Sequence, residues 1–251
     1  MTSLREGEWA QLQQGALSLG VVLDRRQGER LLSLWTAVEK AAEKVNLTGI
    51  QERGEGLEKH LLDSIAVLAI RGCQGDGRLL DVGSGGGFPG LALKAACPQW
   101  EVVLLDATRR KVQALENVTR ELGWEVGLLW GRAEEKARGD LREAFARVTA
   151  RALASPWVAL EWVLPFAAVG GEAWFWWGPS STQAAVVEDL RDVAWTLGAR
   201  LEEIKEYRLP FSGAERRLWV FKKEMATPDE YPRRVGVAQR KPLGRHPERR
   251  R

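Results

Sequence analysis

The sequence predicts an α/β protein, in which a doubly wound, mostly parallel sheet of seven strands carries an N-terminal helical extension. Three observations support this fold class. The first 70 residues show only helical periodicity, and after them short apolar runs alternate with longer amphipathic segments. A glycine-rich loop also follows the first apolar run. Right-handed crossovers between parallel strands then require helices on both faces of the sheet.

Length and composition predict one large domain with additions at both ends. The chain has 251 residues, of which 45% are apolar and 28% charged, as in ordinary globular proteins. We expect a helical extension over 1–72, a ligand-binding domain over 73–224 and a basic C-terminal tail over 225–251. No stretch approaches the roughly 20 apolar residues that span a bilayer, and no secretory signal is visible. We therefore expect a cytoplasmic protein with no membrane contact.

The two cysteines predict neither a disulfide framework nor a metal centre. Cys73 and Cys97 do not form a CxxC pair, and Cys97 ends a predicted helix, where it is most simply part of the core. The chain has only two histidines, His60 and His246. Because structural zinc takes four Cys or His ligands, we expect no metal site.

The N-terminal region predicts two helices joined by a turn. Asp24 is a candidate N-cap for a helix over 25–45. Its apolar residues recur at helical spacing, and they are Leu31, Leu32, Leu34, Trp35, Val38 and Ala42. A second helix is expected over 55–70, and the sequence NLTG at 46–49 predicts the turn between them.

The rest of the domain predicts alternating strands and helices. Strands are expected over 79–82, 102–105, 126–130, 147–150, 172–177, 201–207 and 218–222. Helices are expected over 89–96, 109–122, 155–168 and 181–197. The last two strands have no room for a helix between them, so we expect a hairpin through a turn at 210–214.

The most informative segment is LLDVGSGGGFPG at 79–90, where an apolar strand ends at a carboxylate, Asp81. Glycines follow, because the chain must turn tightly and let a ligand approach its backbone. They are Gly83, Gly85, Gly86 and Gly87. Pro89 suits the first turn of the next helix. In an open α/β sheet, ligands bind at this carboxyl edge of the strands.

The residues around the loop favour S-adenosylmethionine as the ligand. No GK[ST] follows the glycines, which excludes a P-loop. Gly85-x-Gly87-x-x-Gly90 matches the dinucleotide fingerprint, so a nicotinamide cofactor stays an alternative. However, Asp81 would repel a pyrophosphate, whereas it would attract the sulfonium and ammonium groups of S-adenosylmethionine.

The second and third strands end in residues suited to an adenosine. Asp106 ends the second strand, 23 residues after Gly83, where a carboxylate can accept both ribose hydroxyls. Its alternative role is a helix cap before Thr108. After the third strand, the backbone of Ala133 and Glu134 can meet the polar edge of adenine. The alternative for Glu134 is a solvated side chain that opens a turn.

Arg151 ends the fourth strand and faces the same edge. An arginine there can hold a carboxylate, a phosphate or a target base. The alternative is an ion pair with one of the glutamates.

Charge is concentrated at the C-terminal end of the chain. Residues 216–251 hold twelve Lys or Arg and four acidic residues. Such a basic end is typical of a protein that binds a polyanion, although a solvated tail is the alternative. Part of this end contains prolines and glycines and is too irregular for a regular helix. The candidate RNA contacts lie there, and they are Arg233, Arg234, Arg240 and Lys241.

These motifs together resemble the bacterial glucose-inhibited division protein B family. The resemblance covers nearly the whole chain through NLTGI, HLLDS, LLDVGSGGGFPGLALK, GRAEE, VTARALAS and YPRRVGVAQRKPL. It implies a Rossmann-like class I S-adenosylmethionine methyltransferase that modifies N7 of a guanine in 16S rRNA. The family's cofactor contacts correspond here to Gly83, Phe88, Asp106, Ala107, Thr108, Ala133, Glu134, Glu135 and Arg151.

The implied reaction needs no general base. Guanine N7 has a free lone pair and no proton to remove, so positioning and electrostatics are sufficient. We therefore assign no catalytic residue, and we name Asp81 and Arg151 as candidate positioning groups. The expected partner is 16S rRNA or the small ribosomal subunit, and the expected state is a monomer. Two alternatives are an NAD-linked oxidoreductase and a non-catalytic RNA-binding or ribosome-assembly protein.

Overall fold

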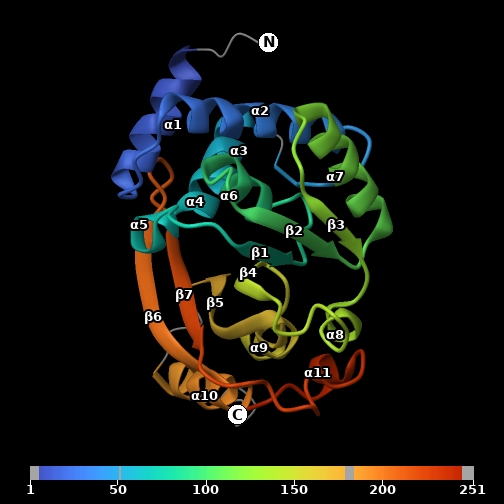
Figure 1. Cartoon of the computed structure of the whole chain (residues 1–251). Coiled ribbons are helices and arrows are strands. Elements are labelled where there is room, and N and C mark those ends of the chain that lie inside the picture. The colour runs from blue at the N-terminus through green and yellow to red at the C-terminus, as the bar shows by residue number, and fades with distance from the viewer. Residues whose placement is uncertain (1–5, 51, 179–183, 245–251) are drawn as a thin grey trace.

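The computed structural model describes residues 6–50, 52–178 and 184–244, and these residues form the predicted α/β architecture (Figure 1). One sheet has seven strands in the order β3-β2-β1-β4-β5-β7-β6. The strands are β1 (Arg78–Val82), β2 (Glu101–Asp106), β3 (Gly127–Trp130), β4 (Phe145–Arg151), β5 (Ala167–Trp177), β6 (Ala199–Arg208) and β7 (Glu215–Lys223). The strand order reverses between β1 and β4, and a crevice at such a switch point is where this kind of sheet binds ligands.

The pairing of the strands confirms a mostly parallel sheet. All neighbours from β3 to β5 are parallel, whereas β7 is antiparallel to both β5 and β6. The predicted hairpin of the last two strands is therefore confirmed. It places the end of the domain at one edge of the sheet, beyond the parallel strands that form the crevice.

Helices cover both faces of the sheet, as Figure 1 shows. On one face lie α6 (Gly90–Ala96) and α7 (Arg109–Leu122), with the N-terminal helices over them. On the other lie α8 (Ala133–Lys136), α9 (Pro156–Val163), α10 (Ala184–Thr196) and α11 (Val237–Arg240). Each face buries its own hydrophobic cluster, so the sheet is apolar on both sides.

The N-terminal extension packs directly on the helices that follow β1 and β2. Its elements are α1 (Glu6–Ser18), α2 (Arg25–Ala42), α3 (Arg53–Gly56), a π-helix (Leu57–Leu62), α4 (Asp63–Ile65) and α5 (Leu68–Arg71). Asp24 caps α2 as predicted, because its side chain accepts a hydrogen bond from the Gln27 backbone at 2.8 Å. From α2, Gln27 and Arg30 donate to the last carbonyl groups of α6.

The predicted helix over 55–70 is interrupted by a π-helix. Gly56 lies against the ring of Trp35, where an added Cβ would come within 1.9 Å. The wider turns that follow contain His60 and lead into Asp63, and both side chains reach Arg151 at the end of β4. Single π-turns are frequent at functional sites, and no periodicity in the sequence announces them.

Two further expectations need correction. The helix predicted over 155–168 ends at Val163, because Pro165 removes a backbone donor; a 3₁₀ turn follows (Leu164–Phe166), and β5 begins at Ala167. The segment expected to be irregular contains the short helix α11. The helix predicted over 181–197 is α10, and residues 181–183 lie outside the described part of the chain.

The expectation about the cysteines is wrong, because Cys73 and Cys97 form a disulfide. The loop before β1 and the end of α6 both lie at the amino edge of the parallel strands, which brings the two Cα atoms to 5.5 Å. Because the two cysteines are 24 residues apart in the sequence, no local pattern predicts that they meet. Cys97 is fully buried, as expected of a core residue.

The basic C-terminal segment is docked on the domain as far as it is described. Arg233 forms a forked ion pair with Glu161 of α9, whose carboxylate is completely buried. Arg142 donates to the carbonyl groups of Thr227 and Tyr231. The buried ammonium of Lys223 also lies 2.6 Å from the Thr227 hydroxyl. Residues 245–251 lie outside the described part.

We predict that Arg233→Ala lowers the free energy of unfolding by about 3 kcal/mol, because it leaves the Glu161 carboxylate buried without its counter-charge. Urea unfolding at neutral pH, followed by tryptophan fluorescence, measures the loss. Arg234→Ala is the matched control, since Arg234 is exposed on the same segment, and it should change stability by less than about 0.5 kcal/mol. Equal effects of the two substitutions would contradict a structural role for the Arg233–Glu161 pair.

Candidate functional site

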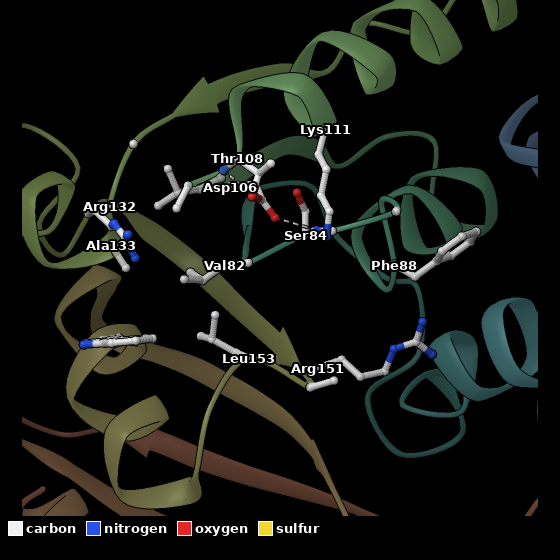
Figure 2. A pocket seen from close by; sticks show the side chains of 18 of the residues that line it. Val82, Ser84, Phe88, Asp106, Thr108, Lys111, Arg132, Ala133, Arg151 and Leu153 are labelled. Atoms are coloured by element: carbon white, nitrogen blue, oxygen red, sulfur yellow. Dashed lines mark hydrogen bonds between the residues drawn. The ribbon is translucent and has the colours of Figure 1, made fainter. Parts of the chain in front are cut away.

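A cavity of about 450 Å³ opens at the carboxyl ends of β1, β2 and β4. Figure 2 shows it as an elongated space with Arg132 and Ala133 at one end and Phe88 and Arg151 at the other. Asp106 lies between these ends. The predicted site residues that line it are Gly83, Gly85, Phe88, Asp106, Ala107, Thr108, Ala133, Glu134 and Arg151.

The glycine loop forms one wall through contacts that exclude side chains. The backbone of Gly83 donates to the Leu105 carbonyl at 2.7 Å, which ties the loop to the end of β2. Gly83 has a φ of +71°, in the left-handed region. At Gly86, an added Cβ would lie 2.5 Å from the carbonyl oxygen of Leu47. The loop therefore fits closely under the N-terminal extension.

Asp106 holds the second wall and keeps lone pairs free for a ligand. Its carboxylate accepts hydrogen bonds from the backbone N–H of Gly85 at 2.9 Å and of Thr108 at 2.7 Å. Each carboxylate oxygen has two acceptor sites, so both oxygens can accept a further donor. Asp106 lines the cavity, as a ribose contact would require, and it also bonds the backbone of Thr108, which is the residue that precedes α7.

Asp81 lies beneath the loop and not in the cavity. Its side chain is completely buried and accepts hydrogen bonds from the Gly90 backbone at 2.9 Å and the Thr149 hydroxyl at 3.0 Å. Burial raises the pKa of Asp81 to about 6, against the lowering effect of these two hydrogen bonds. The idea that Asp81 meets a ligand directly is therefore corrected: its contacts fix the start of α6.

Arg151 is anchored by the N-terminal extension. It donates to the Lys59 carbonyl at 2.8 Å and pairs with the buried carboxylate of Asp63 at 3.1 Å. An ion pair was the alternative for Arg151, and the structure has it, with an aspartate of the extension in place of a glutamate. Asp63 also accepts from the Tyr207 hydroxyl at 2.6 Å and lies 3.6 Å from the guanidinium of Arg216.

His60 lies beside Arg151 as a neutral ring. Burial, with the charges of Arg151 and Lys59, lowers the pKa of His60 to about 3. Arg151 donates to Nδ1 at 3.2 Å, so Nε2 carries the proton and donates to the Thr48 hydroxyl at 2.6 Å. The ring also stacks on Phe88, with centroids 4.6 Å apart. Both nitrogens are thus engaged.

Two of the predicted cofactor contacts lie away from the cavity. Gly87 and Glu135 do not line it. Glu134 does line it, but its carboxylate accepts from the Gly236 backbone at 3.2 Å, so it holds the C-terminal segment as well. Of the four candidate RNA contacts, Arg233 is engaged by Glu161, whereas the exposed ones are Arg234, Arg240 and Lys241.

The structure adds wall residues that the sequence reasoning did not assign. They are Leu47, His60, Lys111, Arg132, Ala152, Leu153, Trp162 and Gln239, among others. Leu47 and His60 belong to NLTGI and HLLDS, which stood out as motifs without a role. Gln239 belongs to the basic C-terminal segment, which therefore reaches the rim of the cavity. Since these residues come from distant segments, only the folded chain brings them together.

The cavity suits a nucleoside with charged substituents. Ser84 Oγ lines it, is buried and has no hydrogen-bond partner, so a polar ligand atom would satisfy it. Asp106 offers acceptors for ribose hydroxyls, and the apolar lining side chains Leu153 and Trp162 offer surface for a base. A second cavity of about 370 Å³ shares Arg151 and Ala152 with the first.

Among the described residues there is neither a metal-binding cluster nor a membrane-spanning helix. No group of three or more His, Cys, Asp or Glu residues in this part of the chain could hold a metal ion. None of its helices is both long and apolar enough to cross a membrane.

Comparisons with known proteins point in one direction. Residues 27–210 match the family model described as rRNA small subunit methyltransferase G. The ribosomal RNA small subunit methyltransferases G of Alkaliphilus metalliredigens and of Pelotomaculum thermopropionicum are each 37% identical to this chain over 234 residues, which is 92% of this chain and 97% of theirs.

Solved structures agree on the fold. A branched-chain polyamine synthase variant from Thermus thermophilus superposes with a TM-score of 0.56 at 16% identity, covering 77% of this chain and 65% of its own. Aeropyrum pernix fibrillarin, solved with S-adenosyl-L-methionine, gives 0.51 at 16% identity, with coverages of 65% and 75%. At these identities the likeness is one of fold.

We predict that Asp81→Asn changes the pH dependence of stability. Because the folded-state pKa of about 6 exceeds the ordinary value of 3.8, the folded protein binds this proton more tightly than the unfolded chain. The buried negative charge lowers the free energy of unfolding. This loss is absent below the ordinary pKa, grows as the pH rises between the two pKa values and is complete above pH 6. The asparagine keeps an acceptor for Gly90 and avoids this cost.

Urea unfolding of both proteins at pH 4.5 and 7.5 measures the difference. The stability of Asp81→Asn relative to the original protein should improve by roughly 2 kcal/mol between the lower and the higher pH. Parallel pH profiles for the two proteins would show that Asp81 does not titrate in this range.

Proposed function

The chain belongs to the rRNA small subunit methyltransferase G family, and we propose that it transfers a methyl group from S-adenosylmethionine to N7 of a guanine in 16S, small-subunit rRNA. The observation that carries the proposal is the coincidence of this family match with a nucleoside-sized cavity at the switch point of the sheet. The family match gives no support to an NAD-linked oxidoreductase or to a non-catalytic assembly protein.

We propose that the cavity holds the cofactor along its length. Asp106 would accept the ribose hydroxyls, with Ala107 and Thr108 beside it, and Ala133 and Glu134 would meet the adenine. The loop of Gly83, Gly85 and Phe88 would hold the amino acid end near Arg151. We keep Gly87 and Glu135 as weaker candidates, since neither lines the cavity. The bound cofactor supplies an electrophilic methyl group on a sulfonium.

The protein groups around the cavity favour an acceptor without a proton. At neutral pH, His60 has an unprotonated Nδ1, but Arg151 occupies it and the pKa of the ring is about 3. The lining carboxylates are Asp106, which we assign to the ribose hydroxyls, and Glu134, which accepts from the Gly236 backbone. Among the described lining residues, none is a free general base. Guanine N7 needs none, because its lone pair attacks directly.

Arg151 is the group best placed to orient the acceptor. It stands where the two cavities meet, and its own position is fixed by Asp63 and the Lys59 carbonyl. A base that enters through the second cavity would therefore pass a fixed, positively charged donor. Such a donor suits guanine O6, and it leaves the N7 lone pair free to attack. Asp81 contributes indirectly, by holding α6 and the glycine loop.

The remaining parts of the chain fit this activity. We propose that residues 73–224 form the cofactor-binding domain, that 1–72 complete its cavity and that 225–251 contribute to RNA contact. Exposed Arg234, Arg240 and Lys241 remain candidates for phosphates, and Arg233 serves mainly to dock the segment. We further propose a monomer that acts in the cytoplasm, on 16S rRNA or on the small subunit.

We predict that Asp106→Asn weakens S-adenosylmethionine binding by at least about tenfold. The amide keeps one acceptor oxygen but directs a donor toward the remaining hydroxyls, which leaves polar groups mismatched. Equilibrium dialysis with labelled cofactor measures the change. Asp140→Asn is the control, because this aspartate is exposed and does not line the cavity. An unchanged dissociation constant for Asp106→Asn would remove the ribose assignment.

The activity itself is tested with methyl-labelled S-adenosylmethionine and small-subunit rRNA that lacks native modification. Naked rRNA and assembled subunits serve as parallel substrates. We expect label in the RNA that is lost on N7-specific depurination. Label that survives depurination would place the methyl group elsewhere, and no label on either substrate, with cofactor still bound, would contradict the rRNA assignment.

A further inference from the structure

A third cavity adjoins the cofactor cavity on the side of the N-terminal extension. Its volume is about 470 Å³, and it lies between the loop over 44–49 and the start of α7. It shares Leu47, Thr108 and Lys111 with the cofactor cavity. A group bound in the third cavity is therefore separated from the cofactor cavity only by these shared residues.

The charge of this cavity has one sign. Lys44, Arg110 and Lys111 line it, and no carboxylate does. Lys44 and Arg110 are exposed, and within the described residues neither takes part in an ion pair. Glu121 lines a neighbouring hollow with Lys44 and Arg110, but it is paired with Lys40. Three cations that line one hollow without a carboxylate among them repel each other and attract an anion.

The position of the cations at the start of a helix makes their mutual repulsion still more unfavourable. Arg109, Arg110 and Lys111 form the first turn of α7, which runs to Leu122 and has no acidic residue in that turn. Cations are unfavourable there because the helix dipole is positive at its N-terminus. The preceding Thr108 makes no side-chain cap. An anion in the cavity would offset both the mutual repulsion and the dipole.

The opposite wall is a fixed loop. Thr48 accepts from the Ile50 backbone at 3.0 Å and from His60 at 2.6 Å. The side chain of Leu47 is buried, and its carbonyl oxygen lies against Gly86 of the cofactor loop. The loop that carries Lys44 toward this cavity is thus built onto the cofactor site. This gives the NLTGI motif a physical role.

We propose that this cavity binds a backbone phosphate of the rRNA next to the target nucleotide, through Lys44 and Arg110. The inference rests on the proposed function and adds a subsite to it. A phosphate fits because it carries the charge that the cavity lacks, and RNA supplies phosphates on both sides of any base that reaches the cofactor cavity. The proposed site lies on the side of the cofactor cavity formed by the N-terminal extension. The C-terminal segment with Arg240 and Lys241 instead reaches the cofactor cavity through Gln239.

The test compares two double variants of equal charge. In Lys44→Gln/Arg110→Gln the proposed contacts are removed, and Lys111 is kept because it also lines the cofactor cavity. The control is Arg26→Gln/Lys205→Gln. Arg26 is an exposed cation in the first turn of α2, as Arg110 is in α7, and Lys205 is an exposed lysine on β6. Neither control residue lines the three cavities described above.

Two readouts use the full chain with transcribed small-subunit rRNA. The first is the salt dependence of RNA binding, where loss of two phosphate contacts should reduce the slope of log K against log salt by roughly 1.5. The second is the KM for the rRNA substrate that the original protein methylates, which should rise about tenfold with a kcat within about twofold. The control variant should match the original protein in both.

Each outcome decides the proposal. An unchanged salt slope, or an equal loss in the control, would overturn the phosphate site. A weaker S-adenosylmethionine affinity in Lys44→Gln/Arg110→Gln, measured by equilibrium dialysis, would also overturn it by assigning the cations to the cofactor. If the original protein transfers no methyl group, the proposed function fails, and the salt slopes alone still show whether this cavity contacts RNA phosphates.

Discussion

The structure depends on a buried carboxylate at the end of the first strand. Asp81 joins three elements, since its oxygens accept from Gly90 at the start of α6 and from Thr149 of β4. The contact leaves no room for a side chain at residue 90, where an added Cβ would lie 2.8 Å from that of Asp81. The glycine loop must therefore close over this contact, and its backbone then faces the cavity. The loop also fixes a second wall, because Gly83 bonds the Leu105 carbonyl and Gly85 bonds the Asp106 carboxylate.

Two buried ion pairs attach the N-terminal extension and the C-terminal segment to the domain that carries the cavity. Asp63 of the N-terminal extension holds Arg151 at the tip of β4, and Glu161 of α9 holds Arg233 of the C-terminal segment. Because an unpaired charge at either place would be costly, the two segments are fixed and not merely appended. The cavity is consequently assembled from three parts of the chain, with His60 from one end and Gln239 from the other. This arrangement couples the groups expected to contact RNA with the groups expected to hold the cofactor.

The fold class and the local elements of the site were determined by the sequence alone. The change from helical to alternating periodicity predicted the sheet and its faces, because the two periods depend only on local geometry. Asp24 as an N-cap and the glycine loop after β1 were found for the same reason: a cap and a glycine loop are local structures with fixed spacing. The family resemblance rested on several such segments in order, and the match over 27–210 confirmed it.

Tertiary structure decided whatever depends on residues that are distant in sequence. No local pattern predicts that Cys73 meets Cys97, that Arg151 meets Asp63, or that a π-helix turns His60 toward Phe88. The sequence showed Asp81 beside the glycines, but only the packing of β4 and α6 showed that it is buried and does not line the cavity. It also showed a basic C-terminal end, whereas the folded chain revealed a second set of cations at Lys44 and Arg110. Spacing along the chain fixes what a segment can form, and long-range packing fixes which groups share a site.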